Sequence, residues 1–553
     1  MGSSSIEKNL ASEYYDAVIV GSGFSGLFML DKLRSEGLKV TVFETGSDIG
    51  GTWHWNRYPG ARVDTEFYVY QFTSPNLYED FDYTERFPSR DEVLRYFRHL
   101  DEKLDLSKDI QFNTTVESAK FHPDDNKWLI NCSNTQTNAN SKVSAKYFIL
   151  CTGSAWKLHV PKIPGLDKFK GTVYHTSRWE GEQNASQFGS KQIAVIGTGA
   201  SGVQVVQELG HKLNTDGKLV VYQRTPNLAL PMKQCLVQGS TNLPKKSDFP
   251  AIYKETRNNY AGIDYDSIPR NALDDNQEER RALYEKLWSK GGFPFWVGSY
   301  QDVLFNKDAN ATAYQFWAEK TRERIQDERK KDILAPLVPP HAFGTKRPSL
   351  EQNYYEVFNK DNVDVVDIRK DPILEITKNG IRTENGGETE FDVIVFATGF
   401  DGITGGILNI QIENGSGQSI QSKWGQGTST QLGITCSGFS NMFFLYGPQA
   451  PTAFSNAPTC CEVQGEWLTR LIGKMEKENL KRVDASVEAE NVWGEIVRGI
   501  WNSTLFPETG SWYDGANIPG KPREPLNYAG GIPSYAKALK ECEENEYKGF
   551  IFQ

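Results

Sequence analysis

The glycine pattern GxGxxG occurs twice in this chain, and each copy follows an apolar run and opens a segment of helix-forming residues. The first copy is formed by Gly21, Gly23 and Gly26, and the second by Gly197, Gly199 and Gly202 with Thr198 and Ser201 between them. In such a loop the first glycine makes a tight turn, the second lets the backbone approach a pyrophosphate, and the third lets helix and strand pack closely. We therefore expect two strand–loop–helix units, each with a site for a dinucleotide.

The residues that end the next strand of each unit differ in charge. After the first loop, the apolar run 40–43 ends in Glu44, whose carboxylate can accept hydrogen bonds from ribose hydroxyls and repels a 2′-phosphate. After the second loop, the run 219–222 is followed by Gln223 and Arg224, and a guanidinium can bind a phosphate through two parallel hydrogen bonds. We therefore expect FAD in the first site and NADPH in the second.

Length and composition agree with a soluble enzyme of several domains, because 553 residues exceed an ordinary domain. The formal charge of −10 disfavours nucleic-acid or anionic-membrane partners, and no apolar run approaches the roughly 18 residues of a spanning helix. The polar segment 1–15 lacks the apolar core of a signal peptide, and Ile6 breaks a myristoylation motif. The 7 cysteines contain no CxxC pair, which disfavours disulfides and zinc. We expect a cytoplasmic, metal-free monomer or weak oligomer.

The order of the strand-like runs predicts an α/β fold of two nested, Rossmann-like dinucleotide-binding domains with a helical insertion. Two runs end in Thr-Gly, at 152–153 and 398–399, and we expect the second to return the chain to the first domain. The predicted domains are an FAD domain over 1–155 and 391–553, an NADP domain over 156–227 and 336–390, and the insertion over 228–335. Charged runs at 276–290 and 311–331 predict helices in the insertion, which either decorates the second domain or caps a substrate cavity.

A string between the two glycine loops resembles the signature of a known family. Residues 169–180 read FKGTVYHTSRWE, and Baeyer–Villiger monooxygenases of the single-chain FAD- and NADPH-dependent type carry FxGxxxHxxxW at this place. The matching residues are Phe169, Gly171, His175 and Trp179. Glu180 departs from the Pro or Asp that usually follows, whereas residues 50–64 match the family string GGxWxxxxYPGxxxD. The resemblance covers nearly the whole chain and is closest to the cyclohexanone, phenylacetone and acetone monooxygenase group.

This resemblance implies a reaction and two catalytic residues. NADPH reduces the flavin, oxygen forms a flavin peroxide anion, and this anion converts a ketone into an ester or lactone, with sulfides oxidised as a side activity. A cation over the flavin is needed to keep the peroxide deprotonated and to stabilise the negative adduct. We assign this role to Arg347, because arginine stays protonated and does not donate that proton. The family match sets Asp64 beside Arg347, where a carboxylate would orient the guanidinium.

The family strings also imply contacts with the cofactors and the substrate. The expected flavin contacts are Thr52, Trp53, Trp55, Tyr58 and Asp64, and those expected at the 2′-phosphate are Arg224, Thr225 and Lys346. Trp512 is expected to contact nicotinamide or substrate through its indole. Phe454, in a loop with Thr452, either narrows the substrate cavity or packs within the loop. His175 and Trp179 are expected to link the nucleotide domains, since no second ligand lies at zinc spacing.

Two other functions compete with ketone oxidation. A flavin monooxygenase that oxidises amines and sulfides also has two dinucleotide sites, but its histidine string lacks the tryptophan spacing found here. Its soft nucleophiles attack a protonated peroxide, so it does not need Arg347. A non-oxygenating NADPH-linked reductase or sensor is disfavoured by the missing CxxC and by the matching catalytic strings. The glycine loops alone do not separate these functions.

Overall fold

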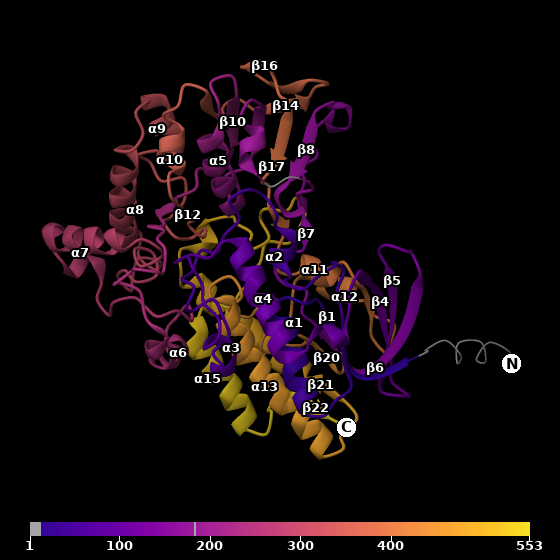
Figure 1. Cartoon of the computed structure of the whole chain (residues 1–553). Helices are drawn as coiled ribbons and strands as arrows, with labels where there is room; N and C mark the ends of the chain where they lie inside the picture. Colours follow the sequence, from indigo (N-terminus) through magenta and orange to yellow (C-terminus); the bar gives the residue numbers. More distant parts are fainter. Residues whose placement is uncertain (1–12, 182–183) are drawn as a thin grey trace.

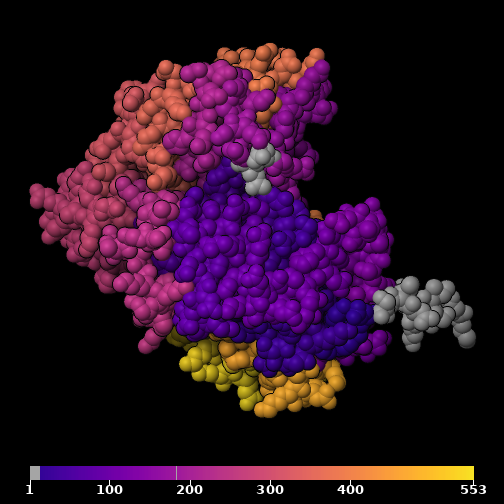
Figure 2. Space-filling model, in the orientation of Figure 1, coloured from indigo at the N-terminus to yellow at the C-terminus, as the bar shows by residue number. Residues whose placement is uncertain are grey.

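The structure, a computed structural model, describes residues 13–181 and 184–553. The prediction for the polar segment 1–15 concerns mostly residues 1–12, which lie outside the described residues. Two sheets with helices on their faces form two lobes, and a helical segment lies beside them, on the left in Figure 1. This arrangement confirms the α/β fold with two nested nucleotide-binding units. Figure 2 shows that the surface is hollowed between the lobes on the right.

The first sheet runs in the order β19-β4-β5-β6-β1-β2-β3, and β20 also pairs with β6. Its strands are β1 (Glu13–Val20), β2 (Val40–Phe43), β3 (Ile110–Gln111), β4 (Thr114–His122), β5 (Lys127–Asn134), β6 (Asn140–Leu150), β19 (Gln411–Glu413) and β20 (Met442–Phe444). β1 pairs in parallel with β2 and β6, whereas β4, β5 and β6 form an antiparallel meander. β2 is buried along its whole length, as expected of a parallel strand covered on both faces.

The second sheet is parallel throughout and runs in the order β13-β10-β9-β17-β8. Its strands are β8 (Thr172–His175), β9 (Gln192–Ile196), β10 (Lys218–Gln223), β13 (Val363–Asp367) and β17 (Val393–Phe396). The chain goes from β9 to β10 on one side, while β17 lies on the other. In an open parallel sheet, ligands bind at the carboxyl ends of strands where the order switches in this way.

The position of β17 corrects the domain boundary predicted at residue 391. β17 pairs with β9 and β8, so it belongs to the second sheet, and the chain rejoins the first sheet only at β19 and β20. The prediction failed because both sheets contain a strand that runs into Thr-Gly beside a glycine loop. Gly21 lies against Cys151, and Gly197 lies against Ala397 in the same way. The Thr-Gly pattern therefore marks the neighbour of a glycine loop rather than one particular domain.

The remaining strands form small sheets. β14, β15 and β16 are antiparallel, β7 pairs with β18, β11 with β12, and β21 with β22. Their bounds are β7 (Lys157–Leu158), β11 (Leu230–Pro231), β12 (Leu350–Glu351), β14 (Ile373–Ile376), β15 (Gly380–Thr383), β16 (Gly387–Glu390), β18 (Phe400–Asp401), β21 (Val483–Ala485) and β22 (Phe550–Phe552). Because β11 and β12 flank the helical insertion, their pairing brings its two ends together.

Helices follow both glycine loops and cover the sheets. α1 (Phe24–Ser35) packs against α13 (Ala457–Lys477), and α5 (Ala200–Lys212) packs against α10 (Tyr354–Val357). The other helices of the lobes are α2 (Thr52–Trp55), α3 (Pro75–Tyr78), α4 (Arg90–Leu104), α11 (Gly405–Leu408), α12 (Ile420–Lys423), α14 (Val487–Asn502) and α15 (Gly531–Glu544). Within the described ranges, we find no helix with the length and apolar character needed to cross a membrane.

The insertion is helical, as predicted, but its second charged run forms two helices. Its helices are α6 (Phe249–Thr256), α7 (Gln277–Lys290), α8 (Lys307–Arg322) and α9 (Glu328–Leu334). The predicted helix over 311–331 is interrupted because Asp327 caps a new helix, accepting a hydrogen bond from the backbone N–H of Lys330 at 2.9 Å.

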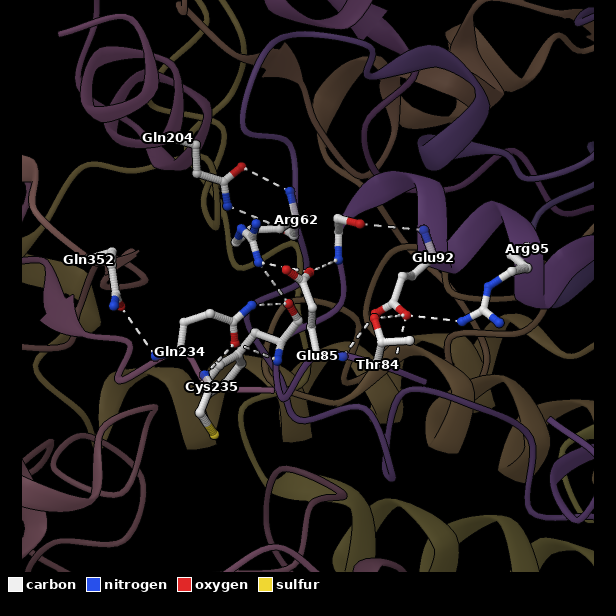
Figure 3. Close-up of polar contacts among 11 residues, drawn as sticks. Arg62, Thr84, Glu85, Glu92, Arg95, Gln204, Gln234, Cys235 and Gln352 are labelled. Carbon is white, nitrogen blue, oxygen red and sulfur yellow. Dashed lines mark hydrogen bonds and ion pairs between the residues drawn. The ribbon is translucent and has the colours of Figure 1, made fainter. Parts of the chain in front are cut away.

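Polar side chains join the first lobe to α5 and to the start of the insertion (Figure 3). The amide of Gln204 donates to the carbonyl oxygen of Arg62 at 3.0 Å, and the guanidinium of Arg62 forms an ion pair with Glu85 at 3.2 Å. Gln234 donates to the carbonyl oxygen of Phe87 at 2.8 Å. The lobes and the insertion are therefore connected by specific contacts on this side.

Candidate active site

The first glycine loop joins β1 to α1 and needs glycine for two different reasons. Gly21 has φ +99°, and a Cβ there would lie 2.6 Å from the carbonyl oxygen of Cys151. A Cβ on Gly26 would lie 1.8 Å from the carbonyl oxygen of Gly21. Gly23 has φ −82°, and a Cβ there would meet only Gly51, at 3.6 Å. Its open side therefore faces space that a ligand can use.

A cavity of about 1110 Å³, partly open to solvent, lies at this loop, and we call it the first cavity. The predicted residues that line it are Gly21, Gly23, Glu44, Thr52, Trp53 and Trp55. Glu44 is buried, and its carboxylate accepts hydrogen bonds from the backbone of Ser22 at 2.8 Å and of Gly46 at 2.7 Å. The glycine loop at the N-terminus of α1, with Glu44 at the end of the next strand, fits a dinucleotide such as FAD.

The second glycine loop repeats this geometry between β9 and α5 but is open to solvent. Gly197 has φ +106°, and a Cβ on Gly202 would lie 2.4 Å from the carbonyl oxygen of Gly197. Gly199 has φ −70°, is exposed, and would carry a Cβ with no neighbour within 4 Å. Thr198 donates to the carbonyl oxygen of Thr225 at 2.7 Å, which holds the loop against the end of β10. The backbone at Gly199 is thus free for a pyrophosphate to approach.

Two cations lie near each other beside the second loop. Arg224 is exposed at the end of β10, whereas the neighbouring Gln223 is buried and donates to the carbonyl oxygen of Ile333 at 2.7 Å. Burial, assisted by the positive charge of Arg224, lowers the pKa of Lys346 to about 8. Such a cationic pair suits the additional phosphate of NADPH.

Arg347 and Asp64, 283 residues apart in the chain, form a two-point ion pair. Nε of Arg347 donates to Oδ2 of Asp64 and Nη2 donates to Oδ1, each at 2.9 Å. The guanidinium carbon also lies 5.3 Å from the ring centre of Phe293, within range of a cation–π interaction. Burial acts to lower the pKa of Arg347, but the carboxylate of Asp64 outweighs burial and raises it. The guanidinium therefore remains a fixed cation.

A second cavity, of about 890 Å³, lies on one side of Arg347, and we call it the apolar cavity. Aromatic and aliphatic side chains dominate its walls, including Phe293, Trp296, Leu304, Phe454 and Phe506. On the other side, burial raises the pKa of Tyr70 and Tyr446, which line the first cavity, and the charge of Arg347 opposes this rise. The charge of Arg347 therefore acts on both cavities.

In the loop at 451–454, Ala453 and Phe454 line the apolar cavity, whereas Thr452 does not. Phe454 lines the cavity and also packs on the rings of Phe506 and Tyr513, at 4.9 and 4.8 Å. The packing of Phe454 within its surroundings is thus observed, and its role beside a substrate stays a prediction. Thr452 does not line the cavity, because its buried hydroxyl donates to the carbonyl oxygen of Gly447 at 2.6 Å. The expected contact of Thr452 with substrate therefore stays a prediction that the lining of this cavity does not support.

Two aromatic residues of the family strings lie away from both cavities. Tyr58 packs in the core of the second lobe and donates to the side-chain oxygen of Gln204 at 2.7 Å, because its segment turns from the first cavity toward α5. Trp512 lies against Gly402, while the next residue, Tyr513, turns inward against Phe454. Neither residue is among those that line the two cavities, so the contacts of Tyr58 with flavin and of Trp512 with nicotinamide or substrate stay predictions.

The string 169–180 includes β8 and leads from the second lobe toward the first. His175 is buried, its Nδ1 lies 2.9 Å from the hydroxyl of Ser177, and burial lowers its pKa to about 4. Trp179 stacks on Tyr174 with ring centres 4.2 Å apart. Phe169 closes over Gly171, where a Cβ would lie 2.6 Å from the Phe169 ring. In the part of the chain that is described, no cluster of three His, Cys, Asp or Glu residues could hold a metal.

Sequence reasoning missed two side chains beside the cavities. Phe293 lies under the guanidinium of Arg347, but a phenylalanine in a helical insertion carries no signal of such a contact. Arg178 stacks on Trp55 and Trp156, which line the first cavity. Its place between the two family residues His175 and Trp179 was the available signal.

Comparison with known proteins agrees with this geometry. The model of the flavin-binding monooxygenase-like family matches residues 16–228. The chain is 44% identical over 543 residues to cyclopentanone 1,2-monooxygenase of Comamonas sp., covering 98% of this chain and 96% of that protein. It is 35% identical over 540 residues to a Baeyer–Villiger monooxygenase of Pseudooceanicola batsensis, covering 97% and 96%. The crystal structure of OTEMO in complex with FAD and NADP superposes with a TM-score of 0.91 at 34% identity, covering 98% and 99% of the chains.

Fold, site and relatives define an FAD- and NADPH-dependent monooxygenase. Within that class, the chain belongs to the Baeyer–Villiger monooxygenases of the flavin-binding monooxygenase-like family.

Proposed function

We propose that the protein converts apolar ketones, cyclic ones foremost, into lactones and esters at a site centred on Arg347. The observation that carries this proposal is a guanidinium fixed by two hydrogen bonds to Asp64 in the wall of an apolar cavity. Cyclic ketones are favoured because a relative that is 44% identical is named for cyclopentanone. FAD, when bound, supplies the chemistry that NADPH and O₂ need to oxygenate the substrate.

Arg347 would stabilise the negative charge that gathers on the carbonyl oxygen as the ketone carbon becomes tetrahedral. Asp64 holds the guanidinium in place before the substrate arrives, so little reorganisation is needed when this charge forms. Phe293 supports the guanidinium from the insertion. Because Arg347 keeps its proton, it stabilises an anion without protonating it. The aromatic and aliphatic walls would bind the hydrocarbon part of the ketone and exclude water.

We further propose that the first lobe binds FAD in the first cavity and that the second lobe binds NADPH at the second loop. Glu44, which lines the first cavity, supports the FAD assignment because it suits a ribose without a phosphate. The cations Arg224 and Lys346 support the NADPH assignment. The insertion acts as a cap of the substrate cavity, an interpretation supported by Phe293 and Trp296 in the wall of the apolar cavity.

The test is the variant Arg347→Ala, assayed for ester formation and for NADPH consumption separately. We expect FAD and NADPH to bind normally while ester formation falls at least about a hundredfold, since a fixed charge at the developing oxyanion is lost. NADPH consumption then yields hydrogen peroxide instead of ester. Arg382→Ala, which removes a surface arginine paired with Glu375 and Glu388, is the control and should leave the rate unchanged. Ester formed by Arg347→Ala at a near-normal rate would remove Arg347 from the mechanism.

The substrate class is tested with cyclic, linear and aryl ketones and one thioether, with products identified by mass spectrometry. We expect the highest kcat/KM with small cyclic ketones. We also propose sulfoxide formation from the thioether as a minor activity, because the apolar cavity admits it. Sulfoxide as the only product would instead favour the amine- and sulfide-oxidising class.

A further inference from the structure

Arg178 is the one guanidinium that we find stacked on two tryptophans within the described residues. Its guanidinium carbon lies 4.2 Å from the ring centre of Trp55 and 4.6 Å from that of Trp156. The two indoles are themselves in edge-to-face contact, with ring centres 5.3 Å apart. The guanidinium also donates to the carbonyl oxygen of Ser177 at 2.7 Å, which fixes its direction. Three contacts therefore hold one half-buried cation in place.

These contacts connect the two lobes. Arg178 ends the short 3-10 helix Thr176–Arg178 that follows β8, a strand of the second sheet, whereas Trp55 ends α2 and Trp156 follows β6 in the first lobe. Both tryptophans line the first cavity. A side chain from the second lobe therefore lies on the wall of the cavity that belongs to the first.

The charge of Arg178 has one acidic counterpart near the cavity. Burial lowers the pKa of Arg178 to about 10, and the carboxylate of Glu44 opposes this shift. Glu44 ends β2 and lines the same cavity. In this fold the carboxylate that ends the second strand marks the adenosine ribose. The ring of His54 lies in edge-to-face contact with Trp55, with ring centres 5.1 Å apart, and both His54 and Glu44 approach Gly46, where a Cβ would lie 2.8 Å and 3.0 Å from them. Arg178 and its tryptophans thus lie toward the adenosine end.

We propose that Arg178 is a positioning residue that closes the adenosine end of the first cavity from the second lobe and slows the release of FAD. This inference rests on the proposed placement of FAD in the first cavity. A cation stacked on indoles at the wall restrains Trp55 and Trp156 and hinders exit of the nucleotide between them. On this proposal, the string 169–180 places Arg178 against the two tryptophans of the first lobe.

The experiment measures the rate of FAD release from diluted holoenzyme by the rise in free flavin fluorescence. Arg178→Ala should release FAD about tenfold faster, as expected when two cation–π contacts are lost, and Arg178→Lys should release it at an intermediate rate. Arg95→Ala, which removes a surface guanidinium 4.8 Å from the ring of Phe81, is the matched control and should behave as wild type. With excess FAD, kcat of Arg178→Ala should recover, and KM for NADPH should stay unchanged.

A second variant separates this proposal from the placement of FAD. Gly23→Ala puts a methyl group into the first cavity without a clash with the protein, so it should weaken FAD binding if FAD lies there. Weak binding by Gly23→Ala together with wild-type release from Arg178→Ala overturns the role of Arg178 alone. Wild-type binding by Gly23→Ala overturns the placement itself. If Arg178→Ala does not fold, Trp156→Leu tests the same contact, and wild-type FAD release from that variant also overturns the proposal.

Discussion

The two glycine loops have nearly the same backbone and opposite surroundings. In each, the first glycine has positive φ and lies against the strand that runs into Thr-Gly, with a Cβ distance of 2.6 Å at Gly21 and 2.4 Å at Gly197. Gly23 in the first loop is half-buried and Phe24 is buried, whereas the matching Gly199 and Ala200 in the second loop are exposed.

This difference in exposure explains how the same loop backbone can bind two different cofactors. An enclosed site keeps its nucleotide through many turnovers, as a flavin requires, whereas an open site lets a nucleotide exchange in each turnover, as NADPH requires. The loop backbone provides the pyrophosphate site in both cases. On the proposed placement of the cofactors, the strand ends select the nucleotide, since Glu44 suits an unmodified ribose and Arg224 suits a phosphate.

The largest expected effect comes from adding one methyl group to the middle glycine of each loop. Gly23 and Gly199 have negative φ, and alanine at either position clashes with no protein atom. Gly23→Ala should purify with little FAD, its dissociation constant raised about a hundredfold, because the methyl group occupies the approach of the pyrophosphate. Gly199→Ala should remain yellow with KM for NADPH raised by a similar factor. Bound flavin and KM measure the two effects, and an exchange of the two phenotypes would reverse the cofactor assignment.

A smaller effect is expected at the end of β10. Arg224→Ala should raise KM for NADPH by about ten- to a hundredfold, because a charge-assisted contact to the 2′-phosphate is lost. KM for NADH serves as the internal control and should not change, since NADH lacks that phosphate. Steady-state kinetics with both nucleotides measures the preference. An unchanged preference would transfer phosphate recognition to Lys346.

Lys346 adds a pH dependence to the second site alone. Its pKa, lowered to about 8 by burial and by the charge of Arg224, means that it is cationic below pH 8 and neutral above. KM for NADPH should therefore rise by up to about fivefold between pH 8 and pH 9, while FAD binding stays constant. In Lys346→Arg the rise should disappear, because arginine keeps its charge. A rise of the same size in that variant would assign the pH dependence to another group.

The sequence alone was sufficient to locate residues whose positions depend on a local pattern. Glu44 and Arg224 follow apolar runs that end at the expected edge of a parallel sheet, so their positions could be predicted from the loops. Arg347 and Asp64 lie 283 residues apart, and only the resemblance to a family brought them together.

Other features depend on tertiary packing that a pattern does not encode. β17 was assigned to the wrong sheet because an apolar strand pattern does not specify which strands pair with it. Tyr58 shares a string with Trp55, yet the chain turns between them, so that Trp55 faces the first cavity and Tyr58 the second lobe. Phe293 has no local mark of its contact with Arg347, because a cation–π pair across the insertion is fixed only by the fold.

The smallest predicted effect tests the position of Tyr58. Tyr58→Phe removes the buried hydrogen bond to Gln204, so the free energy of unfolding should fall by about 1 kcal/mol while the visible flavin spectrum stays unchanged. Tyr70→Phe is the matched control, because the Tyr70 hydroxyl accepts a hydrogen bond from Trp53 at 3.1 Å and lines the first cavity. That variant should shift the spectrum. Urea unfolding and absorbance spectra measure the two responses. A spectral shift in Tyr58→Phe equal to that of Tyr70→Phe would show that Tyr58 contacts the flavin. Separate responses would show that the string 50–64 contributes side chains to both lobes.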